Sequence, residues 1–510
     1  MVCQVNFGAR GRNSLYMVRQ PTLQRLQTGS RQPVTLLSEL FPSLPEVTSS
    51  PSRKALRWLL TALAVVAGSA VMLARVGQRG PLDTIYVEDG YVFLLQALAY
   101  PGHIFISDGG YLELFPRLAA QLAALGPLRD AAVVLSFSGA IAAAGTAVFI
   151  YYASAGHVRT PWLRALLGLS VILLPIAPLE IADSAVGAPW YLLLALFWAT
   201  LWRPRSASGR AVAAVMGFLA TASTTMAFLL FPILLLRVAA LRRVREHAVT
   251  IGCAVGLVLQ VIVAHSSHQS RLRRVNPPGS VLAYYAHEVV LRSVGWHVSW
   301  GLQKSLGLNG ATAVVGVFLA VAFGWILVAG SRRVRLLVVV ALVTGFISTY
   351  VPTTLQAFVP FETATQRIDP ASRYTVVALF LFAAAAIVAV DDLLRGAQRA
   401  GPAEPAELPG PAEPAEPAGP AEPAEPVGLP RASAALSPVG VAAAVTLVAV
   451  LSLGWITDFR SPYGRGGAAL WEPIAAQMLT ACRHSPSGFI EPPPDWTTVR
   501  ISIPCANLRS

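Results

Sequence analysis

Charged side chains are scarce in this chain of 510 residues, of which 13% are Asp, Glu, Lys or Arg and 55% are hydrophobic. A soluble globular protein carries about 25% charged residues. The charges lie between long apolar runs, which is typical of a polytopic membrane protein. Lysine occurs only as Lys54 and Lys304, so the net charge of +13 comes almost entirely from arginine. Because basic residues mark the cytoplasmic side of a membrane protein, this charge does not indicate nucleic-acid binding.

Short catalytic motifs are also missing. The chain contains no P-loop, G-x-S-x-G, H-E-x-x-H, dinucleotide fingerprint or C-x-x-C zinc pattern, so nothing points to nucleotide hydrolysis or metalloprotease activity. The apolar runs are almost free of ionisable residues, and Gln260 is the most polar large side chain within them. Ion-coupled transporters usually place titratable groups at membrane depth. Their absence here argues against a transporter and directs attention to the loops.

The apolar runs predict an all-α polytopic membrane protein with about eleven transmembrane helices. Residues 1–54 are polar and are expected to be a disordered cytoplasmic segment. The first run starts too late for a signal peptide. Ser223, Thr224 and Thr225 interrupt the apolar pattern, and they belong either to a turn between two short helices or to one long broken helix. The runs lie at about 56–76, 131–152, 163–179, 189–202, 211–224, 226–241, 248–264, 311–330, 335–352, 373–390 and 434–456.

Arginine distribution predicts the orientation. The connecting segments that carry Arg alternate with an Arg-free turn at 180–189, which places the N-terminus in the cytoplasm and the chain in the plasma membrane. The transmembrane core then spans 55–395, with long external loops at 77–130 and 265–310. The second loop departs from the rule because it carries Arg271, Arg273 and Arg274.

After the core, the chain continues with a linker, the last predicted helix at 434–456 and a tail. Residues 396–433 contain a Pro-Ala-Glu repeat, which we interpret as an extended cytoplasmic linker, with a docking site as the alternative. An odd number of spans places the tail, 457–510, outside the cell. Cys482 and Cys505 both lie there, and an oxidising compartment permits a disulfide between them. Such a bond would stabilise the tail by ~3 kcal/mol in the chain-entropy model.

The first external loop carries the candidate catalytic acids. Its stretch TIYVEDGYVFLL places Glu88 and Asp89 side by side, and a similar stretch, SDGGYLELF, contains Asp108. Asp before a helical run is a good N-cap, so Asp89 and Asp108 are expected to cap two amphipathic interfacial helices. For Glu88 and Asp89 a functional role is equally open, because a cap needs only one acid. Paired acids beside an apolar surface can act as a general base or hold a divalent cation.

Arginines at the same face are candidates for binding phosphate. Arg117 follows Pro116 in the first loop, and Arg373 stands where the tenth predicted span begins. Each either extends to lipid headgroups or grips a phosphate bidentately. His287 and Glu288 lie in an aromatic stretch of the second loop, but adjacent positions diverge on a helix and do not make a convincing metal pair.

This pattern resembles the GT-C superfamily of multispan glycosyltransferases that use polyprenyl-phosphate-linked sugars. The matching elements are Asp83, the Glu88-Asp89-Gly90-Tyr91 signature after the first span, and a short external C-terminal tail. The resemblance implies sugar transfer from a lipid-linked donor to an envelope glycan, lipid or protein acceptor. It also implies Asp83, Glu88 or Asp89 as the base, Arg117 or Arg373 on the leaving phosphate, and possible assistance by Mg²⁺ or Mn²⁺. The competing hypotheses are a flippase for lipid-linked intermediates and a non-catalytic envelope-assembly protein.

Overall fold

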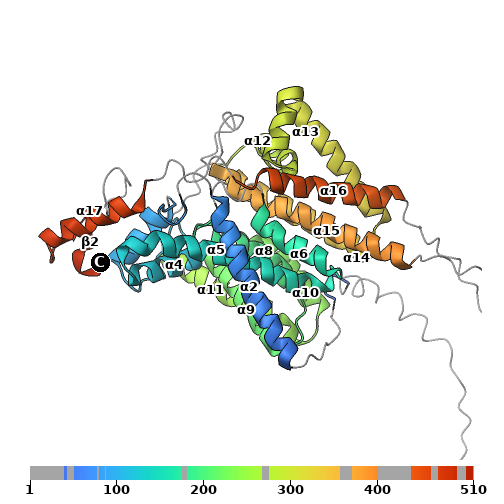
Figure 1. Ribbon diagram of the computed structural model, residues 1–510. Helices are drawn as coiled ribbons and strands as arrows, with labels where there is room; N and C mark the ends of the chain where they lie inside the picture. The colour runs from blue at the N-terminus through green and yellow to red at the C-terminus, as the bar shows by residue number, and fades with distance from the viewer. Residues whose placement is uncertain are drawn as a thin grey trace, which may run out of the picture.

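The computed structural model consists almost entirely of helices (Figure 1). Within its described part, six helices are long and apolar enough to cross a membrane: α2, α5, α11, α13, α14 and α15. This architecture fits the all-α membrane protein predicted from composition. The described residues are 39–42, 51–76, 80–86, 88–174, 181–266, 275–355, 370–399, 438–460, 469–490 and 501–508.

The main helices follow one another along the chain with short connections. Each of the predicted apolar runs contains a helix, although several are too short to match the six membrane-length helices. A helix of 14 residues is about 21 Å long, against a hydrocarbon core of about 30 Å. The helices are α2 (Pro51–Arg75), α3 (Leu95–Ala99), α4 (Leu114–Leu125), α5 (Ala131–Ala153), α6 (Pro161–Leu173), α8 (Ala188–Leu201), α9 (Ala207–Ser223), α10 (Phe231–Ala240), α11 (Ala248–Ser266), α12 (Pro278–Tyr284), α13 (Trp296–Ala329), α14 (Arg332–Leu355), α15 (Val376–Arg399), α16 (Pro438–Thr457) and α17 (Trp471–His484).

Local sequence explains where several of these helices begin. Proline stands in the first turn of α6, α8 and α10, where its missing N–H would have no helical partner. Ser206 caps α9 by accepting a hydrogen bond from the Gly209 N–H at 3.0 Å. Asp391 and Asp392 on α15 bind the starts of two other helices, since Asp391 accepts from the Thr160 N–H before α6 and Asp392 from the Ser331 N–H before α14.

The centre of the molecule is formed by α8 and α15. Every residue of α8 is buried, and α15 is buried over almost its whole apolar length. A helix that is hydrophobic on all sides must be surrounded by protein or lipid, and here the neighbouring helices surround both. Glycines allow the closest approach elsewhere: a Cβ at Gly252 of α11 would lie 2.0 Å from the Ala214 carbonyl oxygen of α9. Small residues thus set the distance between α9 and α11.

The interruption at Ser223 is a chain reversal between two helices. Thr224 is extended, α9 ends before it, and a 3-10 segment, η4 (Thr225–Leu230), leads into α10. Near the end of α10, the Arg237 guanidinium donates to the carbonyl oxygens of Thr200 and Trp202, which precede α9. The end of α10 has therefore returned to the level at which α9 began. The structure favours two antiparallel helices over one long broken helix.

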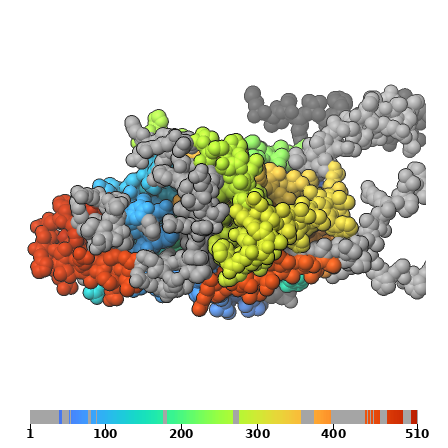
Figure 2. Space-filling view, turned by 90° about the horizontal axis from the view of Figure 1, so that it is seen from above, coloured from blue at the N-terminus to red at the C-terminus, as the bar shows by residue number. Residues whose placement is uncertain are grey.

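The first loop folds into short helices that pack against the C-terminal tail (Figures 1 and 2). A π-helical turn, η1 (Asp89–Leu94), precedes α3, and α4 follows after a turn. Leu118, Leu122 and Leu125 are exposed on α4, which gives this helix an outward apolar face. On the other side, α17 shares a hydrophobic cluster with η1, α3 and α4.

The tail is joined to itself and to the first loop by specific bonds. Cys482 and Cys505, the pair considered from the sequence, form a disulfide with Cα atoms 5.3 Å apart. Two short strands, β1 (Phe489–Ile490) and β2 (Ile503–Pro504), pair antiparallel beside it. The Trp471 indole N–H donates to the Leu128 carbonyl oxygen at 2.7 Å. These contacts hold the tail together and fix it to the end of the first loop.

Two other segments differ in detail from expectation. Leu40 and Phe41 lie within the N-terminal segment expected to be disordered, yet both are buried, and the Phe41 ring lies 5.7 Å from the Arg237 guanidinium. The second loop is helical in α12 and passes through Gly295, whose φ of +93° allows the turn into α13. Gly307 kinks α13, so the predicted span at 311–330 is the second part of a longer helix. The 396–433 linker and Arg271, Arg273 and Arg274 lie largely or wholly outside the described residues.

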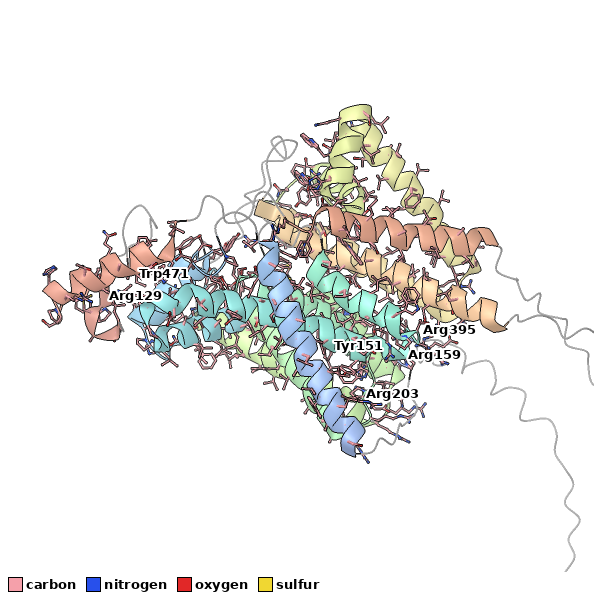
Figure 3. The ribbon with its side chains drawn as sticks, in the orientation of Figure 1. Arg129, Tyr151, Arg159, Arg203, Arg395 and Trp471 are labelled. Atoms are coloured by element: carbon pink, nitrogen blue, oxygen red, sulfur yellow. A yellow bond between two sulfur atoms is a disulfide. The ribbon has the colours of Figure 1, made fainter. Side chains whose placement is uncertain are left out.

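Charged side chains mark two ends of the helical body. Figure 3 places Arg159, Arg203 and Arg395 at one end and Trp471 at the other. Near the first group, Asp391 bonds the N–H groups of Arg159 and Thr160 and pairs with Arg395 at 2.7 Å. The end with Trp471 holds the first loop and the tail. Arg129 is labelled beside Trp471, so arginine occurs at both ends of the helical body.

Candidate functional site

A polar cavity of about 150 Å³ lies where the first loop meets the ends of the central helices. Side chains reach it from the first loop, the start of α8, the turn between α9 and η4, and a 3-10 segment, η8 (Pro370–Thr375), before α15. These segments are far apart in sequence. The lining residues are Glu88, Phe93, Asp108, Tyr111, Glu113, Val186, Pro189, Trp190, Ser223, Thr224, Thr225, Met226, Arg373 and Tyr374.

Glu88 and Arg373 form an ion pair at this cavity. The Arg373 Nη1 lies 3.3 Å from Glu88 Oε1 and 3.4 Å from Oε2, and the two side chains keep roughly a quarter of their surface exposed (26% and 29%). These distances are longer than the 2.7–2.9 Å or so of a tight charge-assisted hydrogen bond. The contact between Arg373 and Glu88 is therefore a loose ion pair.

Asp89 faces away from Glu88 and has a different set of contacts. Its side chain is fully buried, and its two carboxylate oxygens accept hydrogen bonds from the backbone N–H groups of Ala185 and Val186 at 2.9 and 2.8 Å. Asp89 is not among the residues that line the cavity. It thus fixes the first loop to the segment before α8. Glu88, not Asp89, occupies the N-cap position of η1, and it makes no side-chain cap bond.

Asp83 lies at the start of the tail helix. Its carboxylate accepts from the Glu472 N–H at 3.3 Å, and its carbonyl oxygen accepts from the Trp471 N–H at 2.8 Å. A negative charge at a helix N-terminus is favourable. Asp83 therefore joins the first loop to α17, and it does not line the cavity.

The acid that sequence reasoning passed over is Glu113. It is buried in the cavity wall immediately before α4, and the Tyr111 hydroxyl donates to it at 3.4 Å. Burial, followed by the negative charges of Asp108 and Glu88, raises the pKa of Glu113 to about 8. The nearby Glu113 charge and burial likewise raise the pKa of Tyr111 above its ordinary value. A carboxyl group with a pKa near neutrality can exchange protons at physiological pH.

The expectation that Asp108 caps an interfacial helix is wrong. Gly109 and Gly110 have φ values of +61° and +93°, and they form a tight turn in which Asp108 pairs with Tyr111 through the backbone. The N-cap position of α4 is Glu113. Two glycines at positive φ make this reversal possible. The turn brings Asp108 and Glu113 to the same cavity.

Arg117 lies one helical turn after Glu113 but does not line the cavity. It is buried, its Nη1 donates to Gln96 Oε1 at 2.8 Å, and its guanidinium lies 5.4 Å from the centre of the Phe93 ring. Burial lowers the pKa of Arg117, and the charges of Glu113 and then Asp108 oppose that shift. Arg117 therefore supports the wall behind Phe93 and supplies positive potential near the acids.

The remaining wall consists of hydroxyls and aromatic rings. Ser223, Thr224 and Thr225 face the cavity at the reversal after α9, and Ser223 Oγ accepts from the Phe115 N–H at 3.1 Å. On another side, Trp190 and Tyr374 pack edge to face with ring centres 5.2 Å apart. Aromatic surfaces with a few placed polar groups are typical of small-molecule binding sites.

The other candidate ligands lie elsewhere or do not form a metal site. His287 Nδ1 is 3.0 Å from Thr312 Oγ1, and Glu288 pairs with Arg292 at 3.7 Å. Within the described part of the chain, no group of three or more His, Cys, Asp or Glu side chains is arranged to hold a metal ion. Because Asp89 binds backbone N–H groups, it does not join Glu88 as a ligand pair. Glu88 is the one member of this predicted pair that lines the cavity.

Comparison of the chain with protein-family models, with curated proteins and with solved structures gives no match. The likeness to GT-C glycosyltransferases therefore rests on the sequence features given above. The site has to be interpreted from its own geometry. That geometry combines two carboxylates, a protonatable buried Glu113 and Arg373 in one cavity.

Proposed function

We propose that this protein is an integral membrane glycosyltransferase that moves a sugar from a polyprenyl-phosphate donor to an envelope glycan, lipid or protein acceptor. The observation that carries the proposal is the convergence of Glu88, Asp108, Glu113 and Arg373 on one cavity beside apolar helices. A lipid-linked donor needs an apolar surface for its chain and a cation for its phosphate. An acceptor hydroxyl needs a base. Arg373 is the candidate cation and the carboxylates of the lining are candidate bases. The apolar helices around the cavity are the candidate surface for the lipid chain.

Arg373 is the proposed phosphate-binding residue. Its planar guanidinium suits bidentate contact with a phosphate. Because its ion pair with Glu88 is long, a phosphate can take the place of the Glu88 carboxylate. As the bond between the anomeric carbon and the phosphate oxygen breaks, the leaving phosphate keeps the electron pair. The positive charge of Arg373 then stabilises the negative charge that develops on it.

A carboxylate of the cavity is the proposed base. The acceptor oxygen attacks the anomeric carbon and passes its proton to Glu88 or Glu113, a step worth ~10²–10⁴-fold in rate. Glu88 is released for this role when the phosphate takes its place on Arg373. Glu113, with a pKa of about 8, is the stronger base once ionised. Asp89 and Asp83 support the loop in this scheme and do not touch the substrate.

The proposed topology has about eleven spans in the plasma membrane, with the N-terminus in the cytoplasm and the tail outside. The cavity and the disulfide Cys482–Cys505 belong to the same end of the molecule, the end with the first loop and α17. A disulfide is favoured in an oxidising compartment. The external face is therefore the proposed place of transfer.

The decisive experiment compares Glu88→Gln, Glu113→Gln and Arg373→Gln with Glu472→Gln and Arg129→Gln, two exposed positions that do not line the cavity. Membranes with equal protein levels would receive a panel of short-chain polyprenyl-phosphate hexoses and pentoses. We expect transfer to fall by about 100-fold or more in at least one acid variant and in the Arg373 variant, with the controls unchanged.

Other outcomes distinguish the competing functions. Unchanged envelope glycans at normal protein level in all three cavity variants would remove the basis for an enzyme. A flippase would show loss of lipid-linked intermediate at the outer leaflet, while transfer from donor added outside the cell continued.

A further inference from the structure

A second hollow, of about 400 Å³, lies at the end of the molecule opposite the first loop. Five arginines line it, and Glu246 is the one acidic residue of its lining: the arginines are Arg203, Arg205, Arg210, Arg243 and Arg245. Figure 3 shows Arg203 at the end of the helical body remote from Trp471. This arginine pocket is separate from the cavity that contains Glu88.

A buried cation holds the walls of the arginine pocket together. Arg237 is 1% exposed, and its guanidinium donates to the carbonyl oxygens of Thr200 at 2.6 Å and Trp202 at 2.8 Å. The same guanidinium donates from Nε and Nη2 to the Glu246 carbonyl oxygen at 3.1 and 2.6 Å. The segment before α9 and the segment before α11 are thereby joined. The pocket is a built feature and not a chance gap between two loops.

The arginines are themselves oriented by local contacts. Arg203 Nε donates to Glu246 Oε1 at 2.8 Å, and Arg210 Nη1 donates to the Arg205 carbonyl oxygen at 2.5 Å. Ser206 caps α9 beside them, so the positive end of a 17-residue helix faces the same region. Several cations around one concave space repel one another. A bound anion would relieve that repulsion.

We propose that the arginine pocket is a binding site for a phosphate-bearing ligand. Guanidinium groups match phosphate oxygens in pairs and make the strongest charge-assisted hydrogen bonds available to side chains. The volume lies in the range of small-ligand pockets, about 300–1,000 Å³. The phosphate can come from an anionic lipid headgroup or from a soluble phosphorylated compound. Both sources present the same group to the arginines.

The test uses the purified full chain and two probes. One is inorganic pyrophosphate, measured by calorimetry; the other is phosphatidylglycerol in nanodiscs, measured by the lipid retained on the protein. The variant is Arg205→Gln with Arg243→Gln, both exposed positions. The matched control is Arg332→Gln with Arg335→Gln, two exposed arginines at the start of α14 that do not line the pocket.

We expect the pocket variant to bind at least one probe at least about tenfold more weakly and the control variant to bind it normally, since the loss of even one such contact is worth about tenfold. Binding of pyrophosphate alone assigns a soluble ligand, and binding of phosphatidylglycerol alone assigns a headgroup. Arg205→Lys with Arg243→Lys keeps the charge and the fold but removes the planar guanidinium groups. It should weaken binding by a smaller factor than the Gln variant does. Equal weakening in the control variant, or no binding of either probe below about 1 mM, overturns the proposal.

Discussion

Glu88 and Asp89 are neighbours in sequence but have unlike environments. Consecutive residues of a helical turn point in different directions, so one carboxylate reaches the cavity and the other reaches the backbone before α8. Asp89 is thereby a residue that positions Glu88, because it fixes the turn from which Glu88 projects. Substitutions at the two positions should have separable effects.

We predict that Asp89→Asn lowers thermal stability and Glu88→Gln does not. An Asn amide can accept only one of the two hydrogen bonds from Ala185 and Val186, and its NH₂ group would face the other donor. Loss of a buried charge-assisted bond costs about 1.5–3 kcal/mol. Detergent-solubilised protein would be compared by its melting temperature. Equal melting temperatures for the two variants would refute the structural role of Asp89.

The raised pKa of Glu113 predicts a specific dependence of the free energy of unfolding on pH. Burial, with repulsion from Asp108 and Glu88, raises its pKa from 4.5 to about 8, although Arg117 and Arg373 oppose the shift. Between these two pH values the unfolded chain is ionised at this position while the native carboxyl stays protonated. The native state then binds more protons, so stability falls as pH rises through this window.

The corresponding variant is Glu113→Gln. It keeps the shape and removes the titration, so its melting temperature should fall less than that of the wild type between pH 5 and pH 8. A shift of this size corresponds to an effect on the order of 4 kcal/mol at pH 8. Glu472→Gln, at an exposed position, serves as control. Parallel pH curves for wild type and Glu113→Gln would contradict the raised pKa.

At the scale of elements, helix contacts depend on glycine at a few places. The approach of α11 to α9 leaves no space for a side chain at Gly252, where a Cβ would meet the Ala214 backbone oxygen at 2.0 Å. Backbone atoms cannot move aside as a flexible side chain can. The distance between these helices positions the end of α9, where Ser223 and Thr224 line the cavity.

Gly252→Ala should therefore destabilise the protein by about 1–3 kcal/mol, the usual cost of overpacking. Gly145→Ala in α5 is the control, because nothing lies within 4 Å of the added Cβ. Alanine also has the higher helix propensity, so this control should be neutral or stabilising. The measurement is the melting temperature in detergent. A Gly252→Ala variant as stable as Gly145→Ala would show that the helices can separate without cost.

At the scale of the whole molecule, the two ends carry different chemistry. One end has the acidic cavity, the first loop and the disulfide-bonded tail; the other has the arginine pocket and the Asp391 contacts. The proposed topology places these two ends at opposite faces of the membrane. The basic end would be cytoplasmic.

Cysteine labelling tests this orientation. With Cys3 replaced by Ser, Cys253 is buried and Cys482 is bonded to Cys505, so a cysteine introduced at exposed Ser206 or Ser485 would be the accessible thiol. Each variant would be treated with a membrane-impermeant maleimide in intact cells. We expect Ser485→Cys to react from outside and Ser206→Cys to react only after permeabilisation. Labelling of both from the same side would overturn the proposed topology.

The sequence by itself determined the helical character of the chain and the region of its candidate site. In a membrane, a continuous apolar run of about 20 residues satisfies its own backbone as a helix, whereas barrel strands are shorter and alternate in polarity, so the apolar runs predict the class. The predicted topology also placed Glu88, in the first loop, and Arg373, at the start of the tenth predicted span, at the same face. These inferences depend on local pattern, which a sequence displays directly.

Only the tertiary structure decided which groups meet. The sequence left open a turn or a broken helix at Thr224, and the choice follows from the contact of Arg237 with Thr200, which no local pattern displays. In the sequence, Glu113 is one acid among several in the first loop. Its raised pKa arises from burial and from charges that other parts of the loop bring close. Asp89 was chosen from the sequence because it is acidic, yet its partners are backbone groups about 96 residues away. Long-range contacts of this kind are set by packing, and packing depends on the whole chain.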